Sequence, residues 1–301
     1  MHYSLASLFP MNIPTTRLGL RPRPFIWVLL LGCILAYPLA PAVSSPSGDK
    51  RDYILVINTY AESTPWSRGI ITDITARVEQ IENLELYTEH INLLLVDSPR
   101  EIETFETNLL REYGKKPPRA LVLIGTPTAL LRNFINSIWK GIPTIVCAEQ
   151  DFVGPDKYYQ KRLPIPASEQ VPLRTLADRD NLTLLYSPAY LDQSIDLMKR
   201  ILPGMDRLIF IDDARYVNRQ TEHDLAELLD SKYGGIKYTV YSADEIGIDQ
   251  LLDSLSTVDV KRTGVLFSSW HYLKNMSGRN EIMTNPFKII ASSSVPLFSL
   301  R

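Results

Sequence analysis

Short, uninterrupted apolar runs alternate along this chain with longer stretches in which apolar residues recur every three or four positions. The first run, Tyr53–Asn58, is followed by Trp66, Ile70 and Ile74, which keep the spacing of one helix face. Continuous apolar runs are typical of strands covered on both faces, as in a parallel sheet flanked by helices. The alternation therefore predicts an α/β protein.

The same cycle recurs in both halves of the chain. In the first half we predict strands at Tyr53–Asn58, Ile91–Val96, Ala120–Gly125 and Pro143–Ala148, and in the second at Leu182–Tyr186, Arg207–Ile211, Tyr238–Tyr241, Gly264–Phe267 and Pro296–Leu300. Between the halves, Asp151–Asp180 holds four prolines and no helical stripe, which is typical of an excursion between domains. Two doubly wound parallel-sheet lobes with a cleft between them are the expected fold.

The resulting domain boundaries divide the chain into four parts. We predict an N-terminal segment at 1–48, a first lobe at 49–150, an interdomain crossover at 151–180 and a second lobe at 181–301. The last predicted strand ends almost at Arg301, where a doubly wound lobe would be expected to continue. We therefore expect the C-terminal part of the second lobe to be missing from this sequence.

The N-terminal segment has the charge pattern of an export signal. It contains no acidic residue, and Arg17, Arg21 and Arg23 precede the apolar run Phe25–Ala40. As a helix this run would be about 24 Å long, which is shorter than the ~30 Å hydrocarbon core of a membrane. A helix that continued to Val43 would nearly reach that thickness. A cleaved signal peptide and a retained hydrophobic helix that anchors the chain in the membrane both fit, and either places the rest of the chain outside the cytoplasm.

Charge and cysteine content exclude several classes of protein. The 32 basic and 34 acidic residues are nearly balanced, so nucleic acid is not an expected partner. The two cysteines, Cys33 and Cys147, each lie in an apolar run, which predicts no disulfide framework. No Gly-rich nucleotide loop or nucleophile elbow is present, and the four histidines lack metal-ligand spacing. We therefore expect no catalytic residue, no metal and no cofactor.

Polar and aromatic residues follow several predicted strands, where open α/β sheets bind ligands. The candidate ligand-binding residues are Tyr60, Ser63, Thr64 and Thr126 in the first lobe, and Tyr190, Asp213, Trp270 and His271 in the second. Ser63 and Thr64 precede a predicted helix, where capping is the alternative role. Three large rings in sequence, Trp270 to Tyr272, predict that one faces the cleft and stacks on a ligand.

An adjacent carboxylate pair, Asp212 and Asp213, also ends a predicted strand. Such a pair suits acid–base or metal chemistry, but neighbouring residues in a strand point in opposite directions, so a turn or cap is the alternative. A hydrolase that uses Asp212, Asp213 and His271 is the enzymatic alternative to a binding protein.

Three stretches resemble known families. Asn181–Asp213, with its Asn-Leu-Thr start and Ile201-Leu202-Pro203 helix end, resembles the opening of the second lobe in type 1 periplasmic solute-binding proteins, particularly the substrate-binding group of ABC transporters. Tyr53–Trp66 and Gly278–Leu300 resemble the extracytoplasmic sensor region of bacterial membrane histidine kinases of the hybrid two-component type. The similarity extends over about residues 50–301, although no kinase segment lies within them.

The resemblance implies a ligand-sensing domain that binds a small solute between its lobes and signals by hinge closure. The expected ligand is an amino acid, a sugar or an aromatic acid, and the expected location is the bacterial inner membrane, with residues after about 43 in the periplasm. A kinase sensor is also expected to form a homodimer. A free-standing solute-binding protein of a transporter is the alternative within the same fold.

Overall fold

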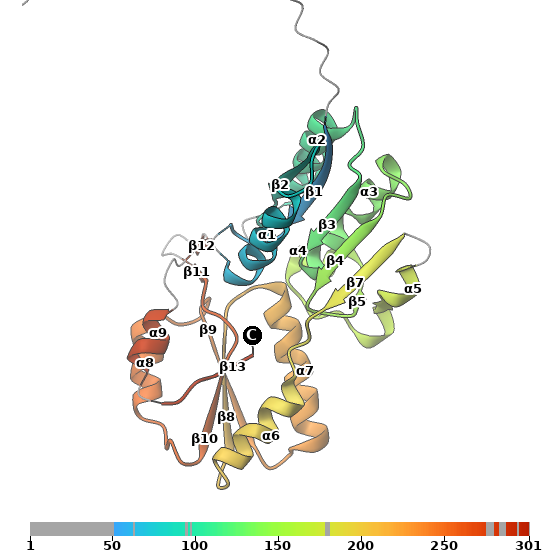
Figure 1. Cartoon of the computed structure of the whole chain (residues 1–301). Helices are drawn as coiled ribbons and strands as arrows, with labels where there is room; N and C mark the ends of the chain where they lie inside the picture. Colours follow the sequence, from blue (N-terminus) through green and yellow to red (C-terminus); the bar gives the residue numbers. More distant parts are fainter. Residues whose placement is uncertain are drawn as a thin grey trace, which may run out of the picture. The chain divides into compact units, whose positions relative to one another are not determined.

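Two parallel sheets, each packed against helices on both faces, organise the chain (Figure 1). This computed structural model describes residues 51–62, 64–93, 96, 98–177, 181–274, 280–282, 287–293 and 295–300. The predicted N-terminal hydrophobic helix lies outside the described residues. Among the helices that are described, none combines the length and the apolar character needed to cross a membrane.

The first sheet has five parallel strands in the order β2-β1-β3-β4-β7. Its strands are β1 (Asp52–Asn58), β2 (Leu84–His90), β3 (Ala120–Ile124), β4 (Thr144–Ala148) and β7 (Leu182–Tyr186). Its covering helices are α1 (Pro65–Val78), α2 (Pro99–Tyr113), the 3-10 helix η1 (Thr126–Leu131) and α3 (Arg132–Ile138).

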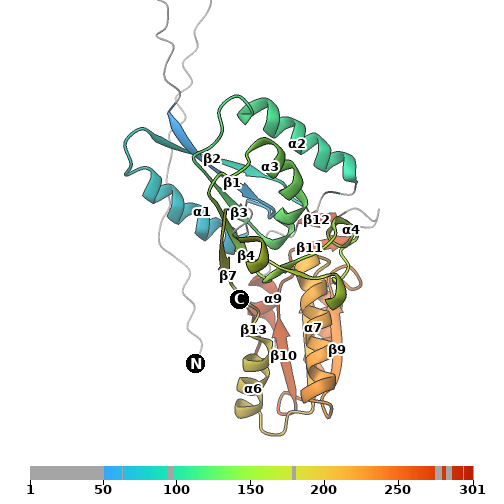
Figure 2. The same ribbon diagram turned by 90° about the vertical axis from the view of Figure 1, so that its right-hand side faces the viewer.

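Alternating strand residues of this sheet enter two separate apolar clusters. Leu55 and Ile57 of β1 pack with α2, η1 and α3, whereas Val56 packs on the other face with Ile70 and Ile74 of α1. Figure 2 shows α1 on one side of this sheet and α2 and α3 on the other. The continuous apolar strands of the sequence are explained by this double covering.

The second predicted strand is shifted toward the N-terminus. We expected Ile91–Val96, but β2 spans Leu84–His90 and pairs in register with β1. Because β2 is an edge strand of this sheet, most of its residues are half-buried. Polar residues therefore alternate with apolar ones along it, and it does not form the continuous apolar run on which the prediction was based.

The segment 151–180 does not connect the two lobes. It leaves the first sheet after β4 and returns to it, because β7 pairs with β4 in parallel, from Thr144 with Leu182 to Ala148 with Tyr186. The strand Leu182–Tyr186, expected to open the second lobe, therefore completes the first. The excursion contains β5 (Phe152–Val153), α4 (Asp156–Lys161), η2 (Ala167–Glu169), β6 (Val171–Pro172) and α5 (Arg174–Ala177).

The second sheet has four parallel strands in the order β13-β10-β8-β9. They are β8 (Arg207–Asp212), β9 (Lys237–Ser242), β10 (Thr263–Phe267) and β13 (Phe298–Ser299), with helices α6 (Leu191–Ile201), α7 (Tyr216–Lys232), α8 (Ile248–Ser256) and α9 (Phe287–Ser292). A separate two-stranded ribbon joins β11 (Tyr272–Lys274) and β12 (Asn280–Ile282). Numbered within its own lobe, each sheet begins with the order 2-1-3-4, so the lobes share one topology.

The second lobe also buries both faces of its sheet. Leu208 and Phe210 pack with α6 and α7, and Ile209 and Ile211 pack with α8 and Ile289 of α9. The expectation of an α/β protein with two parallel-sheet lobes is confirmed.

The start of α7 packs against the first lobe. Tyr216 belongs to the first lobe's apolar cluster, and its ring lies 4.6 Å from that of Tyr159 on α4, centroid to centroid. One turn later, the buried Gln220 accepts a hydrogen bond of 2.8 Å from the backbone N–H of Ile165. The lobes therefore meet through α7 and the excursion that contains α4, and the chain passes from one to the other at Ser187–Tyr190.

Candidate functional site

A small pocket lies where strand ends of both lobes meet, and we call it the interlobe pocket. Tyr60 follows β1, Pro127 is the second residue of η1 after β3, and Arg215 and Tyr216 lie at the start of α7 after β8. Tyr159 on α4 closes another side. These positions at the carboxyl ends of parallel strands are where α/β sheets place ligands.

A buried carboxylate, Glu149, organises the first-lobe side. The Tyr60 hydroxyl donates to its Oε1, and Thr126 donates to its Oε2 through both the backbone N–H and Oγ1, at 3.0 Å each. Thr126 Oγ1 in turn accepts from the backbone N–H groups of Glu149 and Gln150, at 3.2 Å each. Glu149 thus ties the ends of β1, β3 and β4 together with uncharged donors.

The turn that presents Thr126 depends on a glycine. Gly125 has φ of 99°, and a β-carbon there would lie 2.1 Å from Thr59 Oγ1. Thr59 Oγ1 itself donates to the Ile124 carbonyl, at 3.0 Å. Only glycine allows this close approach and this backbone conformation together.

Asp213, fully buried after β8, is the corresponding carboxylate of the second lobe. Its Oδ1 accepts from Arg215 Nε at 2.8 Å and from Asn218 Nδ2 at 2.6 Å, and its Oδ2 accepts from Ser269 Oγ at 2.9 Å and from the His271 backbone N–H at 2.8 Å. Burial alone would raise the pKa of Asp213, but Arg215 and these N–H donors outweigh it and hold the pKa below its ordinary value. Asp213 is therefore a charged anchor for Arg215.

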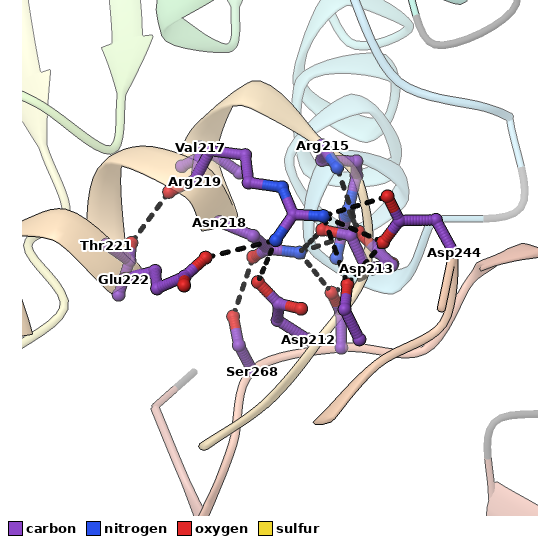
Figure 3. A network of polar contacts seen from close by, with 12 residues as sticks. Asp212, Asp213, Arg215, Val217, Asn218, Arg219, Thr221, Glu222, Asp244 and Ser268 are labelled. Atoms are coloured by element: carbon purple, nitrogen blue, oxygen red, sulfur yellow. Dashed lines mark hydrogen bonds and ion pairs between the residues drawn. The ribbon is translucent and has the colours of Figure 1, made fainter. Parts of the chain in front are cut away.

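The neighbouring Asp212 faces a different set of partners, as expected for adjacent strand residues. Figure 3 shows Arg219 between Glu222 and Asp244, with Asp212 close by. Arg219 Nη2 donates to both oxygens of Asp244, at 2.7 and 2.9 Å, and Nη1 lies 3.6 Å from Asp212 Oδ2. Burial raises the pKa of Asp212 to about 7, and Ser242 and Arg219 oppose this shift only in part. The two aspartates are thus not a shared catalytic pair.

The structure brings some of the predicted site residues together. Tyr60 lines the interlobe pocket, Thr126 is joined to Tyr60 through Glu149, and Asp213 is bound to Arg215, which also lines the pocket. His271 contributes its backbone N–H to Asp213.

Other predicted site residues lie elsewhere. Trp270 is 0% exposed and packs in the second lobe's core, because its indole fills the space between the sheet and α8 and α9 rather than facing a cleft. Tyr190 is 59% exposed at the start of α6 and does not line the interlobe pocket. Thr64 is the N-cap of α1, without a side-chain cap bond, and Ser63 is outside the described residues. Tyr60 and Trp270, expected in one cleft, therefore share none.

The pocket also contains residues that sequence reasoning missed. Tyr159 and Arg162 come from α4 and its C-cap, inside the stretch expected to lack helices. At six residues, α4 is too short to show a periodic stripe, and Pro155 before it is the one signal that could have marked its start.

The pocket can hold little in its present form. Its cavity of about 30 Å³ suffices for about two water molecules. Its walls combine tyrosine rings, apolar side chains such as Leu130 and Val217, and the guanidinium groups of Arg162 and Arg215. Among the described side chains, no group of three or more His, Cys, Asp and Glu is arranged to hold a metal ion.

Comparisons with known proteins give distant structural similarities only. No protein-family model matches the chain, and no curated protein matches it significantly. A conserved domain protein from Vibrio cholerae is similar over 83% of this chain and 74% of its own, with 15% identity and a TM-score of 0.49. An ABC domain from Streptococcus pneumoniae in complex with L-Trp matches over the same shares, with 12% identity and a TM-score of 0.48.

A third similar structure is a ligand-free, open substrate-binding protein with adhesive properties from Clostridium difficile. It has 11% identity and a TM-score of 0.45, and the match covers 82% of this chain and 74% of that protein. With all three TM-scores below 0.5, the fold of this chain rests on its own strand order and connections.

Proposed function

We propose that this chain is a binding protein that holds a small solute in the interlobe pocket. The observation that carries the proposal is that strand ends from both lobes line this one pocket, with Tyr60 on one side and Arg215 and Tyr216 on the other. A solute placed there touches both lobes, so its affinity depends on how they are arranged. That dependence is what a conformational signal requires.

The lining favours a small organic acid with an apolar or aromatic body. Tyrosine rings and aliphatic side chains suit the body, and arginine is the side chain that best matches a carboxylate. Aromatic acids and apolar amino acids satisfy both requirements. Sugars remain the less favoured of the three expected classes, because hydroxyl-rich rings need more polar partners than this lining offers.

The proposed mechanism is closure of the lobes around the solute. The present cavity is too small for such a ligand, so binding requires the walls to move, and Ser187–Tyr190 is the connection about which they turn. A ligand shifts this equilibrium only by its difference in affinity for the two arrangements, typically about 1–3 kcal/mol.

The setting that we propose is an extracytoplasmic sensor of a membrane histidine kinase, in the bacterial inner membrane. The charge pattern before Phe25–Ala40 supports export, and the resemblance of Tyr53–Trp66 supports the sensory role. Sensory pairing would make it a homodimer. A gene that continues into kinase segments would support this setting, whereas a neighbouring permease gene would favour a transporter subunit.

We propose no reaction for this chain. The three residues that a hydrolase would use do not form a set: Asp213 is bound to Arg215, Asp212 faces Arg219, and His271 donates its backbone N–H. Loss of hydrolytic turnover on His271→Ala, with the fold intact, would contradict this view.

A ligand screen on the purified full chain tests the proposed function. We expect at least one member of a panel of aromatic acids, amino acids and sugars to raise the melting temperature, and Arg162→Gly to reduce that rise. Arg162 has φ of 54°, so glycine removes its guanidinium without straining the backbone. Arg200→Ala, at an exposed position of α6, is the matched control and leaves the rise unchanged. No stabilising compound, or equal loss in both variants, would contradict the proposal.

A further inference from the structure

A second, larger cavity lies on the first lobe, where α1 begins and β2 ends, and we call it the α1 groove. Its volume of about 850 Å³ falls within the range of about 300–1,000 Å³ that is typical of small-molecule sites. Its polar lining includes Glu62, Arg68, Thr72, Thr88 and His90. Tyr60 lines both this groove and the interlobe pocket, so the two cavities are neighbours. Unlike the interlobe pocket, the α1 groove has room for a whole solute as it stands.

One buried amide fixes the elements around this groove. Asn58, 0% exposed at the end of β1, accepts a hydrogen bond of 3.1 Å from the backbone N–H of Tyr60 through Oδ1. Because Oδ1 faces this N–H, Nδ2 faces Ser67 Oγ at 3.3 Å and His90 Nδ1 at 3.2 Å. The turn after β1, the first turn of α1 and the end of β2 are therefore held together by a single side chain.

The same contact determines which nitrogen of His90 carries the hydrogen in the neutral ring. Asn58 Nδ2 can only donate, so His90 Nδ1 accepts and the hydrogen is on Nε2. Within the described residues Nε2 has no hydrogen-bond partner, and His90 is exposed. Its N–H is thus available to donate to a ligand, and the hydroxyls of Thr72 and Thr88 can donate or accept.

Glu62 and Arg68 supply one negative and one positive charge to this groove. Neither side chain makes a hydrogen bond or an ion pair with any residue in the described ranges, and they do not pair with each other. At the opposite end of the same sheet, by contrast, Asp52 pairs with Lys116 at 3.2 Å and with Arg119 at 3.0 Å. Two opposite charges that are kept apart in one cavity are complementary to a ligand that carries both signs.

We propose that the α1 groove is a second binding site, which holds a zwitterionic amino acid with a polar side chain. The carboxylate of such a ligand pairs with Arg68, whose planar guanidinium matches it, and the ammonium pairs with Glu62. A side-chain carboxamide both donates and accepts, so it suits His90 Nε2–H and the threonine hydroxyls. The site goes beyond the proposed function, because its charged residues are not those of the interlobe pocket.

Calorimetry with matched ligands on the full chain tests the two charge contacts. The probes are L-glutamine, N-acetyl-L-glutamine, which lacks the ammonium, and L-glutaminamide, which lacks the carboxylate. We expect L-glutamine to bind about fivefold more tightly than either analogue, because each analogue loses one ion pair near the surface. Glu62→Gln should remove only the discrimination against the N-acetyl probe, and Arg68→Gln only that against the amide. Equal binding of the three probes to the unmodified chain would overturn the site.

Arg77→Gln is the matched control. Arg77 is exposed in the last turn of α1 and does not line the groove, so the same substitution there should leave the affinity for L-glutamine unchanged. All three substitutions are at exposed positions, and melting temperatures within about 2 °C of the unmodified chain will show that the fold is intact. Equal losses of affinity in Arg68→Gln and Arg77→Gln would reveal a general effect of net charge and would overturn the inference.

Arg162→Gly separates this site from the interlobe pocket, which Arg162 lines. If this variant loses L-glutamine binding while Glu62→Gln and Arg68→Gln retain it unaltered, the solute is in the interlobe pocket. That result would overturn the groove and leave the proposed function standing. An unmodified chain that does not bind L-glutamine would also overturn the groove, and the proposed function would then be decided by its own ligand screen.

Discussion

Each lobe buries a carboxylate at the carboxyl end of a central strand, but the two are held differently. Glu149 in the first lobe accepts hydrogen bonds from Tyr60 and Thr126, both uncharged. Asp213 in the second lobe is bound to the guanidinium of Arg215, whose side chain is only 10% exposed. A buried charge whose counter-charge is removed costs far more than a buried group that loses a neutral partner. The second lobe's strand end should therefore be the more fragile of the two.

The matched amide substitutions Asp213→Asn and Glu149→Gln test this difference most strongly. Asp213→Asn removes the buried carboxylate charge that lies 2.8 Å from Arg215 Nε, so we expect it to lower the free energy of unfolding by about 3–5 kcal/mol. Glu149→Gln keeps one carbonyl oxygen as an acceptor and should cost about 1–3 kcal/mol. Urea denaturation of both variants measures the two losses. Equal losses would contradict the distinction between the lobes.

The first-lobe arrangement also depends on backbone geometry at Gly125. Gly125→Ala should cost about 2–4 kcal/mol, because its β-carbon would meet Thr59 Oγ1 and its φ is positive. Gly141→Ala is the control, since Gly141 has φ of 81° but nothing within 4 Å of an added β-carbon, and it should cost only about 1–2 kcal/mol. A loss no greater at Gly125 than at Gly141 would show that the close contact is relieved.

The second lobe should show a pH dependence that Asp212 causes. The pKa of Asp212 is about 7 in the folded chain, against an ordinary value of 3.8, so the folded chain keeps a proton that the unfolded chain releases. Its stability should therefore fall as the pH rises from about 4 to about 7, by up to about 1.4 kcal/mol per pH unit, and then level off.

Asp212→Asn should remove this component of the pH dependence. Urea denaturation across pH 4 to 8 compares the variant with the unmodified chain. Asp213 acts in the opposite sense: its lowered pKa means that its stabilising effect is lost only as the pH falls below about 4. An unchanged slope in Asp212→Asn would show that Asp212 is ionised in the folded chain at neutral pH.

The smallest effect is expected at Tyr190. Because the ring of Tyr190 is exposed, we expect Tyr190→Ala to change the free energy of unfolding by no more than about 0.5 kcal/mol. Tyr60→Phe, which removes a donor from Glu149, should cost about 1–3 kcal/mol. Thermal or urea unfolding of both variants tests whether the buried tyrosine contributes more to the free energy of unfolding than the exposed one. A larger loss of stability in Tyr190→Ala than in Tyr60→Phe would contradict this.

The alternation of apolar runs and helical stripes was enough to predict two parallel-sheet lobes. What it could not assign was the sheet that each strand joins: Leu182–Tyr186 is a well-formed strand pattern, but only its pairing with β4 shows that it belongs to the first lobe. Strand pairing between distant segments is a tertiary choice that the local pattern does not contain.

Local pattern predicted the candidate site only in part. The polar strand ends that contain Tyr60, Thr126 and Asp213 were visible, because residues after parallel strands gather at one edge. The role of Trp270 could not be predicted, because an indole after a buried strand can point into the core as readily as out of it. The space available in the core determines which of these occurs. Arg162 was missed because α4 is too short to be periodic.

Hydrogen exchange of the full chain, with and without a stabilising solute, tests the central claim most directly. If both lobes hold the solute, amide protection should increase on both sides of the interlobe pocket, around Tyr60 and Thr126 in the first lobe and around Arg215 to Asn218 in the second. Protection confined to one lobe, or to a surface away from these residues, would contradict the account.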